Sequence, residues 1–321
     1  MHLRYVHVKV PAAETSSGSS RTLLALLATE HECEAGDFDE MMVYLHGFPD
    51  MGVHPTMVDF ASRVPAKLSV FWLKQEQETS KVAFLTFNFG GIPGSDNELR
   101  FTNKTISHEV EDVVAVCKHT RSSFLRQEGK VHIVGLSTGA IVGALLREQQ
   151  VADTITVIAG LLDLTKGVHY DFDTVQLEQI ATQGWCWKEF YLPHGCPLPK
   201  HAELSVDGIH PAAELPDTTT CSKLYVRLDR QYVSEYSDGS LDIAHAVSRP
   251  GSPPLLVIHG DADQDVPFPN GMELFAAAAE PKTFLAIPKA NHLLSDTKHL
   301  KKALRAIGEH VQAVHLQGSR T

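Results

Sequence analysis

Short apolar runs recur along the chain, and most lack the alternation of polar and apolar positions that a half-exposed strand shows. Runs rich in Val, Ile, Leu and Phe predict strands covered on both faces, at 41–45, 82–87, 131–134, 155–158, 255–258 and 284–287. Helix-like stretches lie between many of them, at 106–127, 140–150 and 270–279. Strands that alternate with helices predict an α/β protein with a mostly parallel central sheet flanked by helices.

Two further strand-like segments, 3–10 and 22–29, lie near the N-terminal end and flank a Ser-rich run at 16–20. Small polar residues between two strands predict a hairpin loop.

The rhythm of strands and helices stops between 163 and 248. This segment holds two aromatic groups and a Pro-rich stretch from His194 to Pro216, and it shows no pattern of buried strands. A stretch of this length is best explained as a lid inserted into a larger domain. We therefore predict a core formed by 1–162 and 249–321, with an inserted lid at 163–248.

Composition limits the partners and the compartment. The net charge of −11 argues against binding to nucleic acid or to an anionic membrane surface. No apolar run approaches the roughly 18 residues that span a bilayer, and no apolar stretch suits export. The five cysteines are odd in number and show no CxxC spacing, so free thiols in a cytoplasmic protein are expected. No motif indicates an oligomeric state.

The strongest motif is GLSTG at 135–139, between the strand-like 131–134 and the helix-like 140–150. A serine at such a position must make a sharp, strained turn that lifts its hydroxyl above the sheet, and small residues two positions away relieve the crowding. The motif predicts Ser137 as a nucleophile and the backbone N–H of Thr138 as an oxyanion donor.

A nucleophilic serine needs a base, and the base needs an acid that orients it. In an elbow of this kind the chain order is Ser, then Asp or Glu, then His. Asp263 and His292 follow the strand-like runs at 255–258 and 284–287 and satisfy this order. Asp261 and Asp265 compete for the acid role, but Asp261 follows the strand too soon and Asp265 lies closer to the end of the loop.

A second oxyanion donor is expected from the loop after an early strand. The run at 41–45 leads into His46-Gly47-Phe48-Pro49. Pro49 has no N–H, so Phe48 is the predicted donor. Gly47 permits a close approach, and His46 is expected to brace the loop.

Together these residues resemble the α/β-hydrolase superfamily. The resemblance rests on HGFPD at 46–50, NFGGIPGSD at 88–96, GLSTG at 135–139, IHGDADQDVP at 258–267 and IPKANH at 287–292. The C-terminal third is similar to feruloyl and cinnamoyl esterases and to serine-aminopeptidase-like hydrolases. The resemblance implies an ester substrate held between the lid and the triad. One departure is Gly90, where similar hydrolases often carry an arginine.

The preferred function is therefore a serine hydrolase that cleaves a small carboxylic ester. In the lid, Trp185, Trp187 and Phe190 are candidates for the substrate pocket, although for any one of them a place in the lid core is the commoner role. An aminopeptidase-like or acyltransferase activity on the same triad remains open. A non-catalytic binding protein on the same scaffold is a weaker alternative, because all three triad residues are present.

Metal and cofactor chemistry find little support in the sequence. His108-Glu109 begins like HExxH but lacks the second histidine. His194, Cys196 and His201 have no paired spacing in their Pro-rich loop. No GxGxxG or P-loop follows a strand, so neither a metal nor a cofactor is expected.

Overall fold

The central feature of the fold is one large sheet. The computed structural model describes residues 1–18, 20–32, 36–76, 80–95, 101–193, 195–198, 210–211 and 221–318. Among these, eight strands pair in the order β1-β2-β4-β3-β5-β6-β10-β11. Their bounds are β1 His2–Val10, β2 Arg21–Thr29, β3 Phe38–Leu45, β4 Val82–Phe87, β5 Leu125–Leu136, β6 Thr154–Ile158, β10 Leu255–Gly260 and β11 Lys282–Ile287. All strands predicted from the apolar runs are confirmed.

Most of the sheet is parallel. Strands β4, β3, β5, β6, β10 and β11 pair in parallel, whereas β1 pairs antiparallel to β2, and β2 antiparallel to β4. The predicted N-terminal hairpin is thus confirmed. Because the parallel strands share a direction, the loops that follow β3, β5, β10 and β11 emerge at one edge of the sheet.

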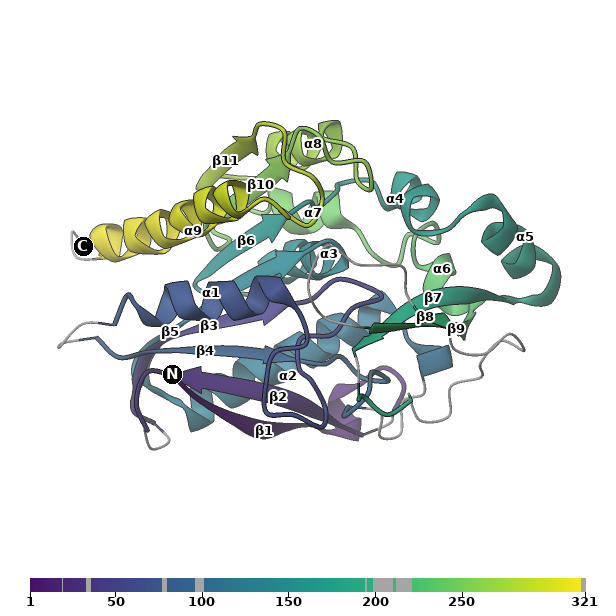
Figure 1. The fold of residues 1–321 in the computed structure, drawn as a ribbon. Coiled ribbons are helices and arrows are strands. Elements are labelled where there is room, and N and C mark those ends of the chain that lie inside the picture. Colours follow the sequence, from purple (N-terminus) through teal and green to yellow (C-terminus); the bar gives the residue numbers. More distant parts are fainter. Residues whose placement is uncertain are drawn as a thin grey trace.

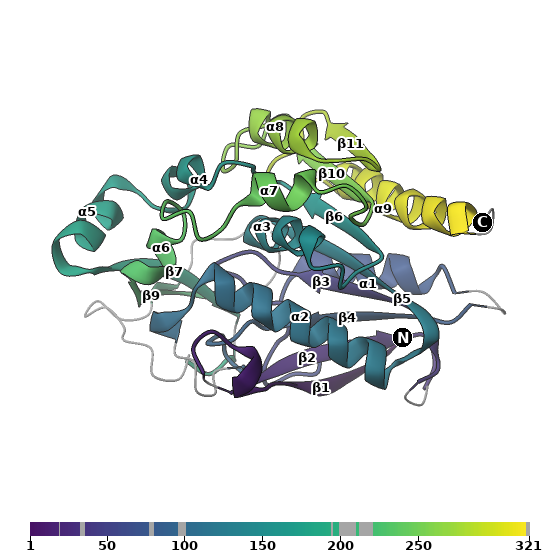
Figure 2. The same ribbon diagram turned by 180° about the vertical axis from the view of Figure 1, so that it is seen from behind.

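Helices cover both faces of this sheet (Figures 1 and 2). In β3, Met42 packs in a core with Leu68 and Trp72 of the first helix, while Val43 packs in a second core with Val113. One face carries α1 Arg63–Leu73 and α9 Thr297–Gly318; the other carries α2 Ile106–Ser123, α3 Thr138–Leu145, α7 Ile243–Ser248 and α8 Pro269–Ala277. Short 3-10 helices lie at η1 Ala12–Glu14, η2 Phe101–Asn103 and η3 Leu146–Glu148. The helix predicted at 106–127 ends earlier, at Ser123, because β5 begins at Leu125.

Most of the segment between β6 and β10 forms a smaller unit beside the sheet (Figure 1), and its last helix returns to the sheet face. Its elements are α4 Leu164–Asp171, α5 Thr174–Gln183, β7 Trp185–Pro193, β8 His210–Pro211, β9 Cys221–Asp229, α6 Arg230–Ser234 and α7. A second sheet pairs in the order β7-β9-β8, antiparallel throughout. The expectation that this segment lacks buried strands is wrong, because every second residue of β7 is buried. At its end, α7 packs against α3 and α8.

Three cysteines of the described part, Cys117, Cys186 and Cys196, are free thiols, as expected from their spacing. Cys33 and the side chain of Cys221 lie outside the described residues, as do Ser19 and Asp96 of the quoted motifs. None of the helices in the described ranges is both long and apolar enough to cross a membrane.

Candidate active site

Ser137 occupies the turn between β5 and α3 in a strained conformation. Its φ is 57° and its ψ is −121°, a region that side-chain-bearing residues avoid at a cost of roughly 1–3 kcal/mol. The neighbouring glycines leave no room for a side chain. A Cβ on Gly135 would lie 2.0 Å from the carbonyl oxygen of Gly139, and a Cβ on Gly139 would lie 2.3 Å from that of Leu45. The strained strand–turn–helix geometry predicted from the motif is therefore confirmed.

The loop after β3 lies directly against this serine. A Cβ on Gly47 would be 3.1 Å from the Cβ of Ser137 and 3.6 Å from its Oγ. Phe48 follows Gly47 in that loop. Thr138 begins α3, where the first N–H groups have no partner within the helix. Both predicted oxyanion donors thus belong to the backbone that surrounds the serine.

His46 is hydrogen-bonded to the loop after β3. Its Nδ1 lies 2.7 Å from the carbonyl oxygen of Gly47, so it donates there, and Nε2 accepts from the N–H of Phe89 at 3.5 Å. Burial lowers the pKa of His46 to about 3, which keeps the imidazole neutral at ordinary pH. A neutral ring with one donor and one acceptor nitrogen is the form that both contacts require, and it braces the loop as expected.

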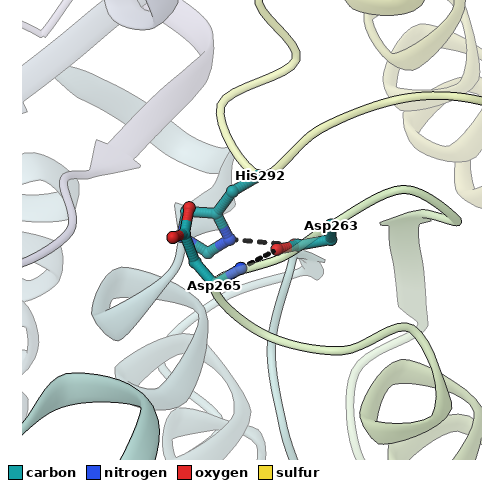
Figure 3. A group of neighbouring side chains, drawn as sticks. All are labelled: Asp263, Asp265 and His292. Carbon is teal, nitrogen blue, oxygen red and sulfur yellow. Dashed lines mark hydrogen bonds and ion pairs between the residues drawn. The ribbon is translucent and has the colours of Figure 1, made fainter.

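Asp263 and His292 form a buried hydrogen-bonded pair (Figure 3). Nδ1 of His292 donates to Oδ2 of Asp263 at 2.9 Å. The other carboxylate oxygen of Asp263, Oδ1, accepts from the backbone N–H groups of Asp265 and Val266 at 3.0 and 2.9 Å. These bonds fix the carboxylate within its turn and hold one tautomer of His292, with Nε2 free to act as a base.

The two competing carboxylates have other surroundings. Asp261 is exposed and its Oδ1 accepts from the backbone N–H of Lys289 at 2.5 Å. Asp265 is also exposed, and Figure 3 shows its carboxylate beside the ring of His292. Asp263 is the carboxylate that is hydrogen-bonded to His292.

Electrostatics favour an ionised Asp263 and a basic His292. Burial works to raise the pKa of Asp263, but hydrogen bonds from His259 and His292 outweigh it and lower that pKa. Burial works to lower the pKa of His292, but the hydrogen bond and charge of Asp263, with the charges of Asp265 and Asp171, raise it instead. A buried histidine with a raised pKa beside a carboxylate is a common signature of a functional site.

Ser137 and His292, the predicted nucleophile and base, lie at the same edge of the sheet. Ser137 follows β5, and Asp263 and His292 follow β10 and β11, with β6 between β5 and β10. Within the described residues, the Ser137 hydroxyl does not donate to His292. Such bonds are often long in a substrate-free site and tighten when substrate binds.

The three aromatic residues proposed for substrate binding lie on opposite faces of β7. Phe190 is fully buried and its ring packs on Phe101 at 5.5 Å between centroids. Trp185 and Trp187 are half-buried and pack on each other at 5.1 Å. Because the strand alternates, the tryptophans face away from the side that carries Phe190.

Tyr232 is a site residue that the motifs did not single out. It is fully buried in α6, and its ring lies 5.0 Å from that of Phe48. Phe101 stacks on Phe48 from η2 at 5.7 Å. The inserted segment thus contacts the loop after β3, which carries Phe48, through the ring of Tyr232. The sequence signal was only the presence of aromatic residues near 225–236, without a spacing that indicates this contact.

One group of side chains has the composition of a metal site. Asp263, Asp265 and His292 each offer a ligand atom within 4.8 Å of the others. Two of them are already joined through Nδ1 and Oδ2, so His292 could offer a metal only its Nε2. Of the loop considered for metal binding, His194 and His201 lie outside the described residues. Cys196 contacts His54 at 3.4 Å.

Comparison with solved structures identifies the architecture. The esterase domain of a Rhodothermus marinus protein is similar over 96% of this chain and 97% of its own, at 17% identity and a TM-score of 0.56. Est1E from Butyrivibrio proteoclasticus, solved with ferulic acid, is similar over 92% and 96%, at 16% identity and 0.61. Alpha/beta hydrolase domain-containing protein 10 from mouse is similar over 98% and 100%, at 15% identity and 0.59. This chain has the α/β-hydrolase fold.

A family model matches part of the chain. The model of the prolyl oligopeptidase family matches residues 225–315, which include Asp263 and His292 but not Ser137. No curated protein sequence shows a significant match to the chain.

Proposed function

We propose that this α/β-hydrolase cleaves a carboxylic ester through an acyl-enzyme on Ser137. The observation that carries the proposal is the strained conformation of Ser137 at the same sheet edge as the Asp263–His292 pair. A strained serine turn has no structural advantage of its own, and such strain concentrates where a side chain must be presented for chemistry.

The geometry supports a two-step reaction. In the first step, Nε2 of His292 accepts the proton of the Ser137 hydroxyl as Oγ bonds to the ester carbonyl carbon. The resulting oxyanion accepts hydrogen bonds from the N–H groups of Phe48 and Thr138. The carbon–oxygen bond to the alcohol then breaks, and His292 gives its proton to the leaving alkoxide. Asp263 stabilises the imidazolium throughout.

The second step repeats this chemistry with water. His292 takes a proton from water as the water oxygen bonds to the acyl carbon. The acid is released when the bond to Ser137 breaks and the serine regains its proton from His292. The raised pKa of His292 makes it a stronger base than an unperturbed imidazole.

An ester substrate is favoured by the aromatic surroundings and by two of the similar structures. One of these is an esterase domain, and another holds ferulic acid, an aromatic carboxylic acid. In this chain Phe48, Phe101 and Phe190 form a continuous set of aromatic contacts beside the oxyanion loop. We propose residues 163–248 as a lid over the substrate pocket, in which the fully buried Phe190 supports the pocket wall from behind through Phe101. Trp185 and Trp187 are not included in the proposed pocket, because they lie on the face of β7 opposite to Phe190.

Labelling with a fluorophosphonate probe tests the proposal. Wild type is expected to be labelled, Ser137→Ala not at all, and His292→Ala at least about 100-fold more slowly, because the base is lost. Ser122→Ala, at an exposed serine of α2, is the matched control and should behave as wild type. A folded wild type that resists labelling would overturn the proposed function. Short-chain, long-chain and aromatic esters then define the substrate.

A peptidase is the second candidate, because the prolyl oligopeptidase model matches the region of the acid and the base. Matched aryl esters and aryl amides of the same acyl group distinguish the two. The ester proposal expects kcat/KM for the ester to exceed that for the amide far beyond their difference in intrinsic reactivity. Comparable values would favour the peptidase. Transfer to an added alcohol in place of water, measured in the same assay, would indicate an acyltransferase.

The proposed enzyme acts in the cytoplasm. The free thiols of Cys117, Cys186 and Cys196 support a reducing compartment. Fractionation of the native cells checks this proposal, and recovery of the protein outside the cytoplasm would contradict it.

A further inference from the structure

A second histidine shares the carboxylate of the catalytic pair. His259 lies near the end of β10 and is fully buried. Its Nε2 is 2.9 Å from the carbonyl oxygen of Val266 and 3.4 Å from Oδ2 of Asp263. Both neighbours are hydrogen-bond acceptors, so Nε2 must carry a hydrogen. The contact pattern therefore assigns the Nε2–H tautomer to this ring.

The opposite side of the His259 ring is closed. Its Nδ1 is buried and has no hydrogen-bond partner within the described ranges. A Cβ on Gly271 would lie only 2.3 Å from Nδ1, so α8 packs against the ring edge. Phe268 covers the ring edge-to-face at 5.8 Å between centroids. A buried nitrogen without a partner carries a free-energy cost, and the ring is nevertheless held in place.

The contacts of His259 explain how the turn after β10 is held. Oδ1 of Asp263 accepts from two backbone N–H groups, those of Asp265 and Val266. The carbonyl of Val266 in turn accepts from His259. Val266 therefore holds the turn through both of its backbone groups: its N–H donates to Asp263 and its carbonyl accepts from His259. Oδ2 of Asp263 is left facing His292.

We propose that His259 is a positioning residue of the active site. It holds the turn formed by residues 263–266, so that Asp263 faces His292, and it moderates the basicity of His292 by sharing Oδ2. The inference rests on the proposed function, because it concerns the base of the same reaction. It assigns a role to a histidine that does not touch the substrate.

The direction in which His259 shifts the pKa of His292 follows from the charge on Asp263. An N–H next to Oδ2 disperses the negative charge of Asp263, which then stabilises the His292 imidazolium less. Without that N–H the imidazolium is stabilised more, and the pKa of His292 rises. Since His292 must be neutral to act as a base, the acidic limb of the kcat/KM profile moves to higher pH.

Two substitutions separate this role from simple packing. His259→Leu fills similar space without a donor, whereas His259→Gln keeps an N–H at the same distance from the backbone. For His259→Leu we expect kcat/KM to fall about 10- to 100-fold, as for other residues that orient a catalytic group. The acidic limb of its kcat/KM profile should move to higher pH by roughly half a unit or more. His259→Gln should restore most of the rate and return the limb toward wild type.

The outcomes are distinct. A folded His259→Leu variant with the wild-type rate and limb would overturn the proposal. A reduced rate with an unmoved limb in both variants would mean that His259 only fills space. If wild type itself neither hydrolyses esters nor reacts with the fluorophosphonate, the proposed function fails, whatever the variants show.

A measurement on wild type keeps the proposal testable if the variants do not fold. Long-range proton–nitrogen NMR of protein labelled with nitrogen-15 histidine reports the tautomer of each ring. The His259 ring, assigned by its proton contacts to the Phe268 ring, should be in the Nε2–H form. An Nδ1–H tautomer would overturn the proposal, because that ring could not donate to Val266 or Asp263.

Discussion

The ring of Tyr232 lies 5.0 Å from the ring of Phe48 and tilts by 31°. This contact joins the inserted segment to the loop that carries one proposed oxyanion donor. Tyr232 is fully buried, and its hydroxyl has no hydrogen-bond partner in the part of the chain that the structure describes. The ring, and not the hydroxyl, therefore makes the contact.

Substitutions at Tyr232 should separate the contribution of its ring from that of its hydroxyl. Tyr232→Phe removes an unpaired buried hydroxyl, so the free energy of unfolding should change by less than about 1 kcal/mol or increase. Tyr232→Ala should cost about 3–5 kcal/mol and slow fluorophosphonate labelling, because Phe48 loses its packing partner. Urea unfolding and labelling rates check both. A large loss in Tyr232→Phe would show that the hydroxyl has a partner after all.

The glycines of the elbow should tolerate no side chain. Gly135→Ala places a Cβ 2.0 Å from a backbone oxygen that cannot move without unwinding the turn. We expect a loss of at least about 3 kcal/mol, or no folded protein. Gly143→Ala is the matched control within α3: its nearest neighbour is 3.5 Å away, and it should raise stability by up to about 1 kcal/mol. Equal stability of the two variants would contradict the strained turn.

Asp265 should tune the pH dependence without being required for catalysis. Its charge contributes to the raised pKa of His292. In Asp265→Asn that pKa should fall, and the acidic limb of kcat/KM should move to lower pH. Because Asp265 is exposed, the shift should be below about one unit and shrink with added salt. Asp261→Asn is the control in the same loop and should leave the limb in place. A large drop in kcat for Asp265→Asn would instead give it a direct role.

Asp50 should lower stability at neutral pH. Burial raises its pKa from 3.8 to about 6, against the opposing hydrogen bond from the N–H of Met51. Below about pH 4 both folded and unfolded states hold the proton, and no penalty exists. Between about 4 and 6 the unfolded state ionises first, so stability falls as pH rises, and above 6 the penalty is complete.

The test compares wild type with Asp50→Asn. At pH 8 the variant should be more stable by roughly 1–3 kcal/mol, and near pH 4 the difference should vanish. Urea unfolding at both pH values measures it. A variant that is less stable at pH 8 would show that the ionised carboxylate is stabilised by contacts stronger than its burial cost.

The sequence predicted those features that depend on the backbone alone. Gly135 and Gly139 are required because carbonyl oxygens occupy the space of a side chain, and this need is visible as spacing. The main strands were predicted because both of their faces are covered, so nearly all their residues are apolar. The order of Ser137, Asp263 and His292 follows from the topology, so their placement at one sheet edge could be expected.

The strands of the inserted segment were not predicted, because the hydropathy of its residues does not follow their burial. In β7, Trp185 and Trp187 lie on the more exposed face, while Lys188 is buried. The ammonium of Lys188 donates to the carbonyl of Asp171 and lies 4.5 Å from the ring centroid of Phe172. A buried lysine and half-exposed tryptophans hide the period of two that would have indicated a strand. The role of His259 was hidden because it depends on tertiary contacts with Val266 and Asp263.

The pairing of β6 with β10 has a consequence for how such a protein can change. Leu255–Ile258 pair with Ile155–Ile158 in parallel, so the sheet itself joins the two ends of the inserted segment. Ser137 and the Asp263–His292 pair are held at one edge of the sheet by this strand pairing. Within 163–248, the part between α4 and α6 can therefore be lengthened, shortened or exchanged while these residues keep their places, whereas Tyr232 and α7 pack against the core. In the proposed enzyme, substrate range and chemistry are therefore carried by largely separable parts of one chain, and new specificities can arise by changing only the first.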